Sequence, residues 1–241
     1  NTNFRTEVDN IRITWWDAVE LQGLRIFDHQ DSLMLGASQA NVDFAILSLI
    51  PPGDPTIDAI RLDRAEVNLL THRGDSTMNI NRWITELGEV FGSSSSTSSG
   101  PKFYIQNIEL RQSAFALINF NPEPVETGLD FNRLEFGEIT ASADQFHLEG
   151  SEIGLKIKIL TGTELNSTLN IQDLKTVLTY SPDFIELDAL SLKTPKSHIK
   201  DYLRMDLTGP DGFGDLYNQV KLTARMAETK VDLEDLRLFV P

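Results

Sequence analysis

One short pattern of apolar residues recurs along the chain and constrains its fold more than any other feature. Apolar side chains stand at offsets 0, 2, 5 and 7, with mostly polar or small residues between them. The clear copies cover residues 19–26, 103–110, 129–136, 185–192 and 231–238, and the weaker copies cover residues 56–62 and 169–176. Alternation with a period of two is typical of a strand with one buried face. The step of three in the middle predicts a β-bulge or a tight bend in the strand.

The number of such stretches predicts the fold class. Alternating segments add up to about fourteen strands, which is large for one sheet unless the sheet curls or splits into two layers. We therefore predict a mainly β protein with a long, curled, antiparallel-rich sheet, shaped as a trough, an open barrel or a sandwich. We expect residues 113–120 to be a strand separate from residues 103–110.

Helices are expected to be few. Residues 78–91 carry the clearest helical signal, since Ile80, Trp83 and Ile84 begin a single apolar stripe at helical spacing. Asp75 or Ser76 is the expected N-cap of this helix. Shorter helices are expected at residues 44–50 and near residues 212–217.

The domain organisation depends on one low-complexity segment. Residues 92–100 read GSSSSTSSG, a composition typical of a flexible tether. This segment separates residues 1–91 from residues 101–241, and both parts carry the repeated strand unit. It is either a loop within one continuous sheet or a linker between two domains.

Composition excludes several classes of function. The 241 residues include 36 acidic and 21 basic side chains, which give a formal net charge of −15. Such a chain lacks the basic footprint of a nucleic-acid-binding protein. It contains no cysteine, so disulfides and thiolate chemistry are excluded. No apolar run approaches the length of a membrane-spanning helix, and we expect any membrane anchor to lie outside this stretch of chain.

No motif in the sequence predicts a catalytic, cofactor-binding or metal site. The four histidines lie far apart in the chain, and phosphate-binding glycine loops and nucleophile elbows are absent. We therefore expect no enzymatic activity and no cofactor. The functional surface that the sequence does predict is an apolar lining made by the repeated units. Its expected residues are Val19, Leu21, Leu24, Ile26, Phe103, Ile105, Ile108, Leu110, Ile185, Leu187, Leu190, Leu192, Val231, Leu233, Leu236 and Leu238.

The first third of the chain resembles a known family. Residues 11–50 are similar to the N-terminal region of AsmA-like and TamB-like envelope proteins, with matching phrases at residues 21–28 and 33–50. Asn79 and Trp83 match the spacing of the phrase that opens a helix in that family. Beyond residue 101 the resemblance depends only on the repeated strand unit. The acidic balance and the serine tether are similar to those of a Bacteroidota member.

The resemblance implies a function in the bacterial cell envelope. Members have an inner-membrane helix and a long periplasmic β body with an apolar interior, and they are implicated in phospholipid movement and in outer-membrane protein assembly. The expected partners are therefore phospholipid acyl chains and an outer-membrane barrel protein. Two alternatives stay open: a structural or protein-interaction scaffold of the envelope without lipid carriage, and a hydrolytic enzyme that uses paired carboxylates on a β scaffold.

Overall fold

The computed structural model describes seven stretches of the chain. These are residues 4–15, 17–44, 56–91, 102–125, 128–150, 152–207 and 220–239. The expected helices at residues 44–50 and 212–217, the serine-rich segment and Trp16 lie outside the described residues, apart from Phe44, which ends a strand.

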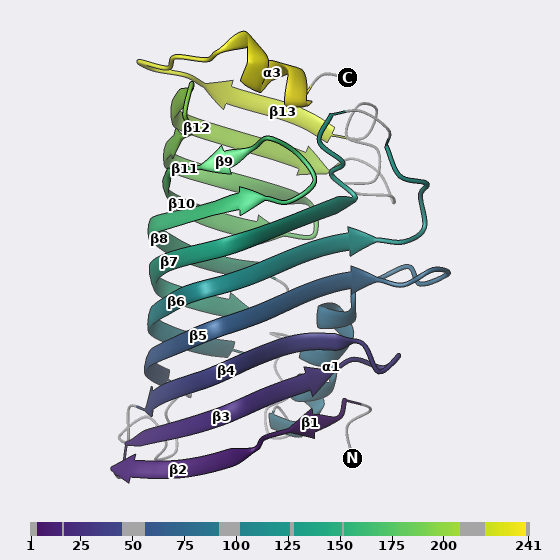
Figure 1. The fold of residues 1–241 in the computed structure, drawn as a ribbon, viewed down its shortest axis with the longest axis vertical. Coiled ribbons are helices and arrows are strands. Elements are labelled where there is room, and N and C mark those ends of the chain that lie inside the picture. Colours follow the sequence, from purple (N-terminus) through teal and green to yellow (C-terminus); the bar gives the residue numbers. More distant parts are fainter. Residues whose placement is uncertain are drawn as a thin grey trace.

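A single sheet of 13 strands dominates the structure, which confirms the predicted mainly β class (Figure 1). The strands are β1 (Thr6–Glu7), β2 (Asn10–Trp15), β3 (Ala18–Phe27), β4 (Leu33–Phe44), β5 (Thr56–Thr71), β6 (Lys102–Asn119), β7 (Arg133–Glu149), β8 (Glu152–Glu164), β9 (Asn170–Ile171), β10 (Asp173–Ser181), β11 (Phe184–Lys193), β12 (His198–Leu207) and β13 (Val220–Arg225). Their spatial order is β1-β3-β4-β5-β6-β7-β8-β10-β11-β12-β13, with β2 beside β3 and β9 beside β8. Among the described residues the first and last strands do not pair, so the sheet is open.

The chain stays in one sheet on both sides of the serine-rich segment. Strands β5 and β6 pair with each other, and this is the one parallel pairing among the described strands. A parallel pair needs a crossover connection, and α1 (Asn79–Phe91) lies on that crossover. Residues 56–71 and 102–119 are therefore hydrogen-bonded neighbours.

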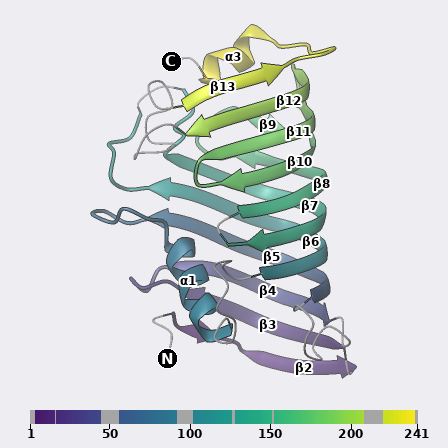
Figure 2. The same cartoon turned by 180° about the vertical axis from the view of Figure 1, so that it is seen from behind.

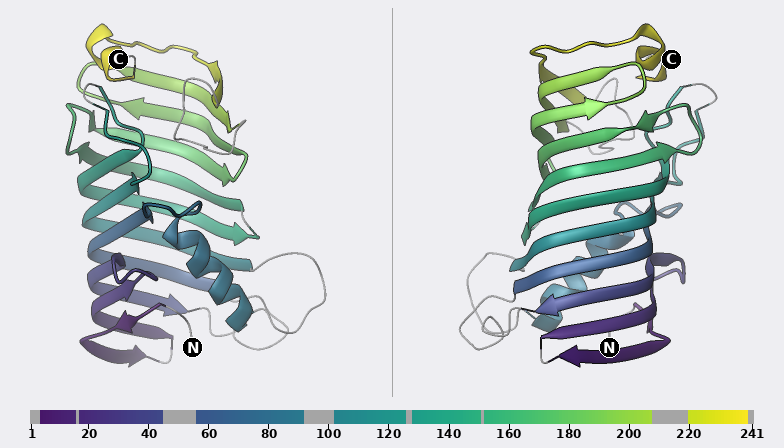
Figure 3. Two further views of the ribbon diagram at one scale, coloured as in Figure 1. Left: turned by 90° about the vertical axis from the view of Figure 1, so that its right-hand side faces the viewer. Right: turned by 60° about the vertical axis from the view of Figure 1, so that its left-hand side comes forward.

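The sheet is folded along a crease, a line of bends that crosses it from strand to strand (Figure 3). In β3 the apolar spacing changes from two to three between Leu21 and Leu24. There Gln22 and Leu24 pair with β4 while Gly23 does not, and the register is the same before and after Gly23. Left-handed backbone, with φ between 48° and 94°, marks the bends. Gly23, Arg64, Gln112 and Glu138 align from β3 to β7, and Gln145, Ala189 and Asp201 align from β7 to β12. The bend predicted from the apolar spacing is thus present in β3 and β11, and neighbouring strands repeat it.

The crease folds the sheet toward its apolar side. Ala37, Ala40 and Ala65 form a buried cluster at the crease, and leucines of β3, β5 and β6 pack against them. Small side chains suit the inside of a sharp bend because the two halves of each strand approach closely there. The apolar residues of both halves therefore lie inside the fold.

Helix α1 confirms the helix predicted at residues 78–91. It lies along the open side of the folded sheet, opposite the crease and beside β3 to β5 (Figures 2 and 3). Ile80, Trp83 and Ile84 are half-buried, as their spacing on one face of the helix predicts.

The expected N-cap of α1 is wrong. The helix begins at Asn79, so neither Asp75 nor Ser76 occupies the capping position. Asp75 instead lies 3.2 Å from the guanidinium of Arg82, one turn into the helix. The side-chain oxygen of Asn79 accepts the backbone amide of Leu70 at 3.1 Å, which joins the helix start to β5.

The predicted strand at residues 231–238 is also wrong, because residues 233–239 form α3 (Leu233–Phe239). The Asp232 carboxylate accepts the amide of Glu234 at 2.9 Å and so caps the helix. Acidic residues occupy the first turn and Arg237 occupies the last, an arrangement that the helix dipole favours. Local capping thus decides between two readings of one apolar pattern.

Two smaller strand predictions need correction. Residues 129–136 are strand only from Arg133 onward, because the Asp130 side chain accepts the amide of Asn132 at 2.9 Å and holds a turn. Residues 103–110 and 113–120 are not separate strands: β6 runs through Gln112 without a break and ends at Asn119. The described residues form thirteen strands, close to the predicted number of about fourteen.

Candidate functional site

The register places apolar side chains of successive strands in rows on one face of the sheet. Residues directly opposite each other in a ladder project from the same face. One row consists of Val19, Val42, Ile60, Ile108, Ala143 and Ile157, from β3 to β8. A second row consists of Leu155, Leu178, Leu187, Leu203 and Ala224, from β8 to β13. We call the surface made by these and parallel rows the apolar face.

Most of the apolar face is only half-buried. Every residue of β3 and every residue of β12 has intermediate exposure. A face covered by a second sheet would bury its inward residues fully. Burial nevertheless raises the pKa of the Tyr180 phenol, which stands in a row with Ile185.

The apolar face continues to both ends of the sheet. Ile11 and Ile13 of β2 stand opposite Leu21 and Val19, and their exposed fractions are 60% and 74%. At the other end, Leu222 of β13 stands opposite Met205 and is 60% exposed. The face is thus open to solvent at its first and last strands.

The opposite face of the sheet carries the charges. Arg61 and Asp43 lie 2.9 Å apart across β5 and β4, and Arg204 contacts Glu186 at 2.9 Å across β12 and β11. Hydrogen bonds from Arg204 and then Tyr202 hold the pKa of Glu186 below its ordinary value. Such pairs keep one face solvated while the other stays apolar.

Three of the four predicted lining units lie on the apolar face or in its core. In β3 they are Val19, Leu21, Leu24 and Ile26; in β6 they are Phe103, Ile105, Ile108 and Leu110; in β11 they are Ile185, Leu187, Leu190 and Leu192. The fourth unit does not contribute a strand: Leu233, Leu236 and Leu238 belong to α3, and Val231 precedes it. Leu233 is 74% exposed, so it is not part of the predicted apolar lining.

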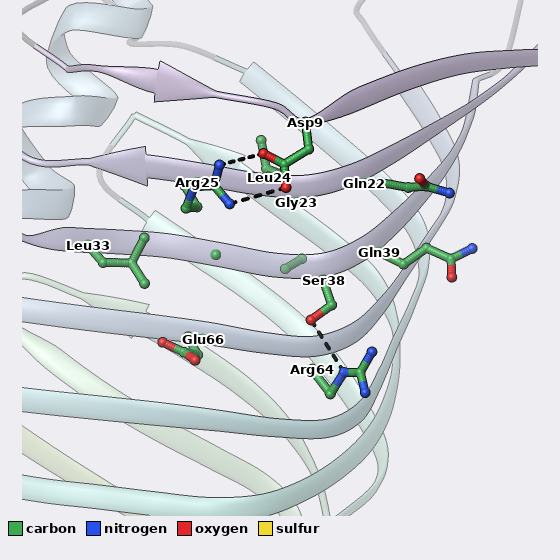
Figure 4. A pocket seen from close by; sticks show the side chains of 12 residues that line it. Asp9, Gln22, Gly23, Leu24, Arg25, Leu33, Ser38, Gln39, Arg64 and Glu66 are labelled. Carbon is green, nitrogen blue, oxygen red and sulfur yellow. Dashed lines mark hydrogen bonds and ion pairs between the residues drawn. The ribbon is translucent and has the colours of Figure 1, made fainter.

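A polar pocket of about 540 Å³ lies at the crease between β3, β4 and β5 (Figure 4). Gln22, Gln39 and Glu66 contribute to its lining, and Arg25 is already paired with Asp9 at 2.6 Å. This pocket was not predicted, because its residues are brought together by the pairing of β3, β4 and β5. Its groups do not form an arrangement of nucleophile and base.

Asp28 is a buried carboxylate at the rim of the fold, near the start of α1. Its Oδ2 atom lies 2.7 Å from His72 Nε2 and accepts the Asn79 side-chain amide at 3.1 Å. Its Oδ1 atom accepts the amides of Gln30 and Ser32 at 2.9 and 3.0 Å. Burial alone would raise the pKa of Asp28, but these hydrogen bonds, that of His72 first, hold it below its ordinary value.

A second carboxylate–histidine pair lies next to the first. His29 Nε2 is 2.9 Å from Asp75, and the rings of His29 and His72 meet edge to face at 5.4 Å. The described residues offer no group of three or more such side chains that could hold a metal ion. We interpret this histidine cluster as an anchor for α1. It was not predicted, because its hydrogen-bonded partners are separated by 44 to 51 residues in the chain.

Comparison with protein-family models, curated proteins and solved structures returned no match to this chain. The described helices are too short, or not apolar enough, to cross a membrane. The observations define a class by fold alone: an open, creased β sheet with one apolar and one charged face. The resemblance to AsmA-like and TamB-like proteins stays a prediction.

Proposed function

We propose that the apolar face binds phospholipid acyl chains and that the protein acts in lipid transfer or outer-membrane protein assembly in the bacterial envelope. The observation that carries this proposal is the register, which joins apolar rows from β2 to β13 on the inside of one fold. The location in the periplasm, with a tether to the inner membrane, is proposed from the resemblance of residues 11–50.

The dimensions of the sheet suit such a ligand. Eleven strands follow one another along the sheet, so the apolar face extends over about 48 Å at a spacing of about 4.8 Å per strand. One leaflet of a bilayer core is about 15 Å thick, so an acyl chain fits with room to move along the face. Contact with ten methylene groups would contribute about 8 kcal/mol before ordering costs.

The proposal is tested by the lipid that accompanies the purified chain. We expect native mass spectrometry after expression in bacteria to show bound phospholipid. Leu203→Glu places a carboxylate on the apolar face, and Thr223→Glu places the same charge on the opposite face of the neighbouring strand. We expect the first to lower bound lipid by about fivefold, equivalent to about 1 kcal/mol, and the second to leave it unchanged.

Folding is monitored for both variants by far-ultraviolet circular dichroism, so that loss of lipid is separated from loss of structure. Equal lipid content in the two folded variants, or a wild-type chain free of lipid, would refute lipid binding by this face. The second of those results, with capture of an outer-membrane barrel protein, would favour the scaffold function instead.

A further inference from the structure

The outer edge of β2 is only weakly protected: it carries Arg12 and an irregularity in its ladder between Ile13 and Trp15. Among the described residues β2 pairs only with β3, so its other edge presents free backbone groups (Figure 1). Edge strands are commonly protected by proline, by inward-pointing charges or by a covering segment. The sequence of β2 is NIRITW, which contains no proline, and its inward residues Ile11 and Ile13 are apolar and exposed.

The opposite edge of the sheet differs. Strand β13 is charged, with Lys221 and Arg225 exposed, and α3 lies beside it (Figure 1). The segment after β13 returns to β12, where Lys230 and His198 exchange two backbone hydrogen bonds of 2.9 and 2.7 Å. The β13 end therefore carries exposed charges and a neighbouring helix, while the described residues leave the outer edge of β2 uncovered.

We propose that the free edge of β2 binds an extended strand of another polypeptide, with apolar residues on the side of the apolar face and acidic residues on the other side. Backbone hydrogen bonds would supply affinity, as in other cases of strand addition. The apolar requirement follows from Ile11 and Ile13, which stand in the rows of the apolar face.

The acidic requirement follows from Arg12. Its side chain lies on the charged face, is 60% exposed and has its nearest described carboxylate, that of Glu20, at 3.8 Å. A carboxylate directly opposite Arg12 would form a cross-strand pair. A second copy fits less well, because its β2 strand, NIRITW, has no acidic residue to stand opposite Arg12.

Strand addition at β2 does not require lipid. Its consequence for lipid binding, a longer apolar face, rests on the proposed function. An added strand with inward apolar residues would lengthen the apolar face by one strand spacing, about 4.8 Å. The β2 edge is then the place where the lipid-binding surface of this chain continues onto a partner.

The test uses the lipid-free chain and a synthetic peptide, VEVEIEV, with VKVKIKV as the charge-reversed control. Hydrogen exchange of the amides in residues 10–15 reports pairing at this edge. We expect the acidic peptide to slow that exchange and to bind at least about tenfold more tightly than the basic one, equivalent to about 1.4 kcal/mol.

Two variants locate the contact. Ile13→Lys introduces a charge on the apolar side of β2 and should weaken binding of the acidic peptide about tenfold. Asn10→Lys adds the same charge on the side of Arg12 and should not weaken it. Unchanged exchange at saturating peptide, equal binding of both peptides, or equal binding by both variants would overturn the proposal. A concentration-dependent dimer that Ile13→Lys abolishes would also overturn it, in favour of a second copy. Lipid content, measured separately, tests the proposed function and not this one.

Discussion

Replacing Asp28 by asparagine probes the buried anchor of α1 with a change of almost no volume. The Asp28 side chain has no exposed surface and accepts four hydrogen bonds. The asparagine can keep the two backbone amides at its oxygen, but its NH₂ group would face the NH₂ group of Asn79. Loss of a charge-assisted hydrogen bond together with an unpaired buried donor gives an expected loss of about 2–4 kcal/mol in the free energy of unfolding.

The pH dependence of this loss has a definite sign. The pKa of Asp28 is lower in the folded chain than in the unfolded chain, so the folded state binds fewer protons in that range. The stabilisation is therefore complete above the unfolded value, about 3.9, and is lost as the pH falls through the folded pKa. The difference between wild type and Asp28→Asn should be full at pH 7 and should shrink below about pH 4.

The assay is urea unfolding followed by circular dichroism at pH 7 and at pH 3. Asp31→Asn is the matched control: Asp31 lies in the same turn, its side chain is 79% exposed, and asparagine tolerates its φ of 59°. We expect this control to change stability by less than about 0.5 kcal/mol. An Asp28→Asn variant as stable as the control, or a loss that is equal at both pH values, would refute the role assigned to the buried carboxylate.

Three further substitutions test the sheet and its end. Ile108→Asp should lower the free energy of unfolding by about 3 kcal/mol or more, since it places an unpaired carboxylate on the apolar face. Urea unfolding measures this loss, with Glu109→Gln on the charged face as the control. An Ile108→Asp chain as stable as the control would show that the assigned facing of β6 is wrong. Gly23→Ala should lower the free energy of unfolding by at least about 2 kcal/mol, because the added Cβ would lie 1.9 Å from a carboxylate oxygen at a position with left-handed backbone. Gly74→Ala adds its Cβ to open space and should lower it by about 1 kcal/mol. Equal shifts of the two melting temperatures would contradict the crease geometry. Asp232→Ala should lose about 1 kcal/mol of capping and speed hydrogen exchange in α3 alone; unchanged exchange there would argue against the cap.

Much of the local structure follows from the sequence alone. The period-two spacing of apolar residues places Val19 and Leu21 on one face of a strand, and the step of three places Leu24 on that same face after a bend. The apolar stripe that begins at Ile80 determines α1. These predictions succeed because side-chain periodicity is a local property, set by the backbone geometry of each element.

Other features needed the tertiary structure. The apolar pattern at residues 231–238 fits a strand or a helix. The hydrogen bond from the Glu234 amide to the Asp232 carboxylate caps and so favours the helix. The anchor of α1 joins Asp28 to His72 and Asn79, residues that only the return of β5 and the parallel crossover bring together.

The sequence determined that this chain forms strands with one apolar side, because alternation is written into each segment. It did not determine that the strands share one open sheet, that the bends align from strand to strand, or that β2 pairs only with β3 among the described residues. Those features depend on register and strand order, which are set by long-range pairing between segments far apart in the chain.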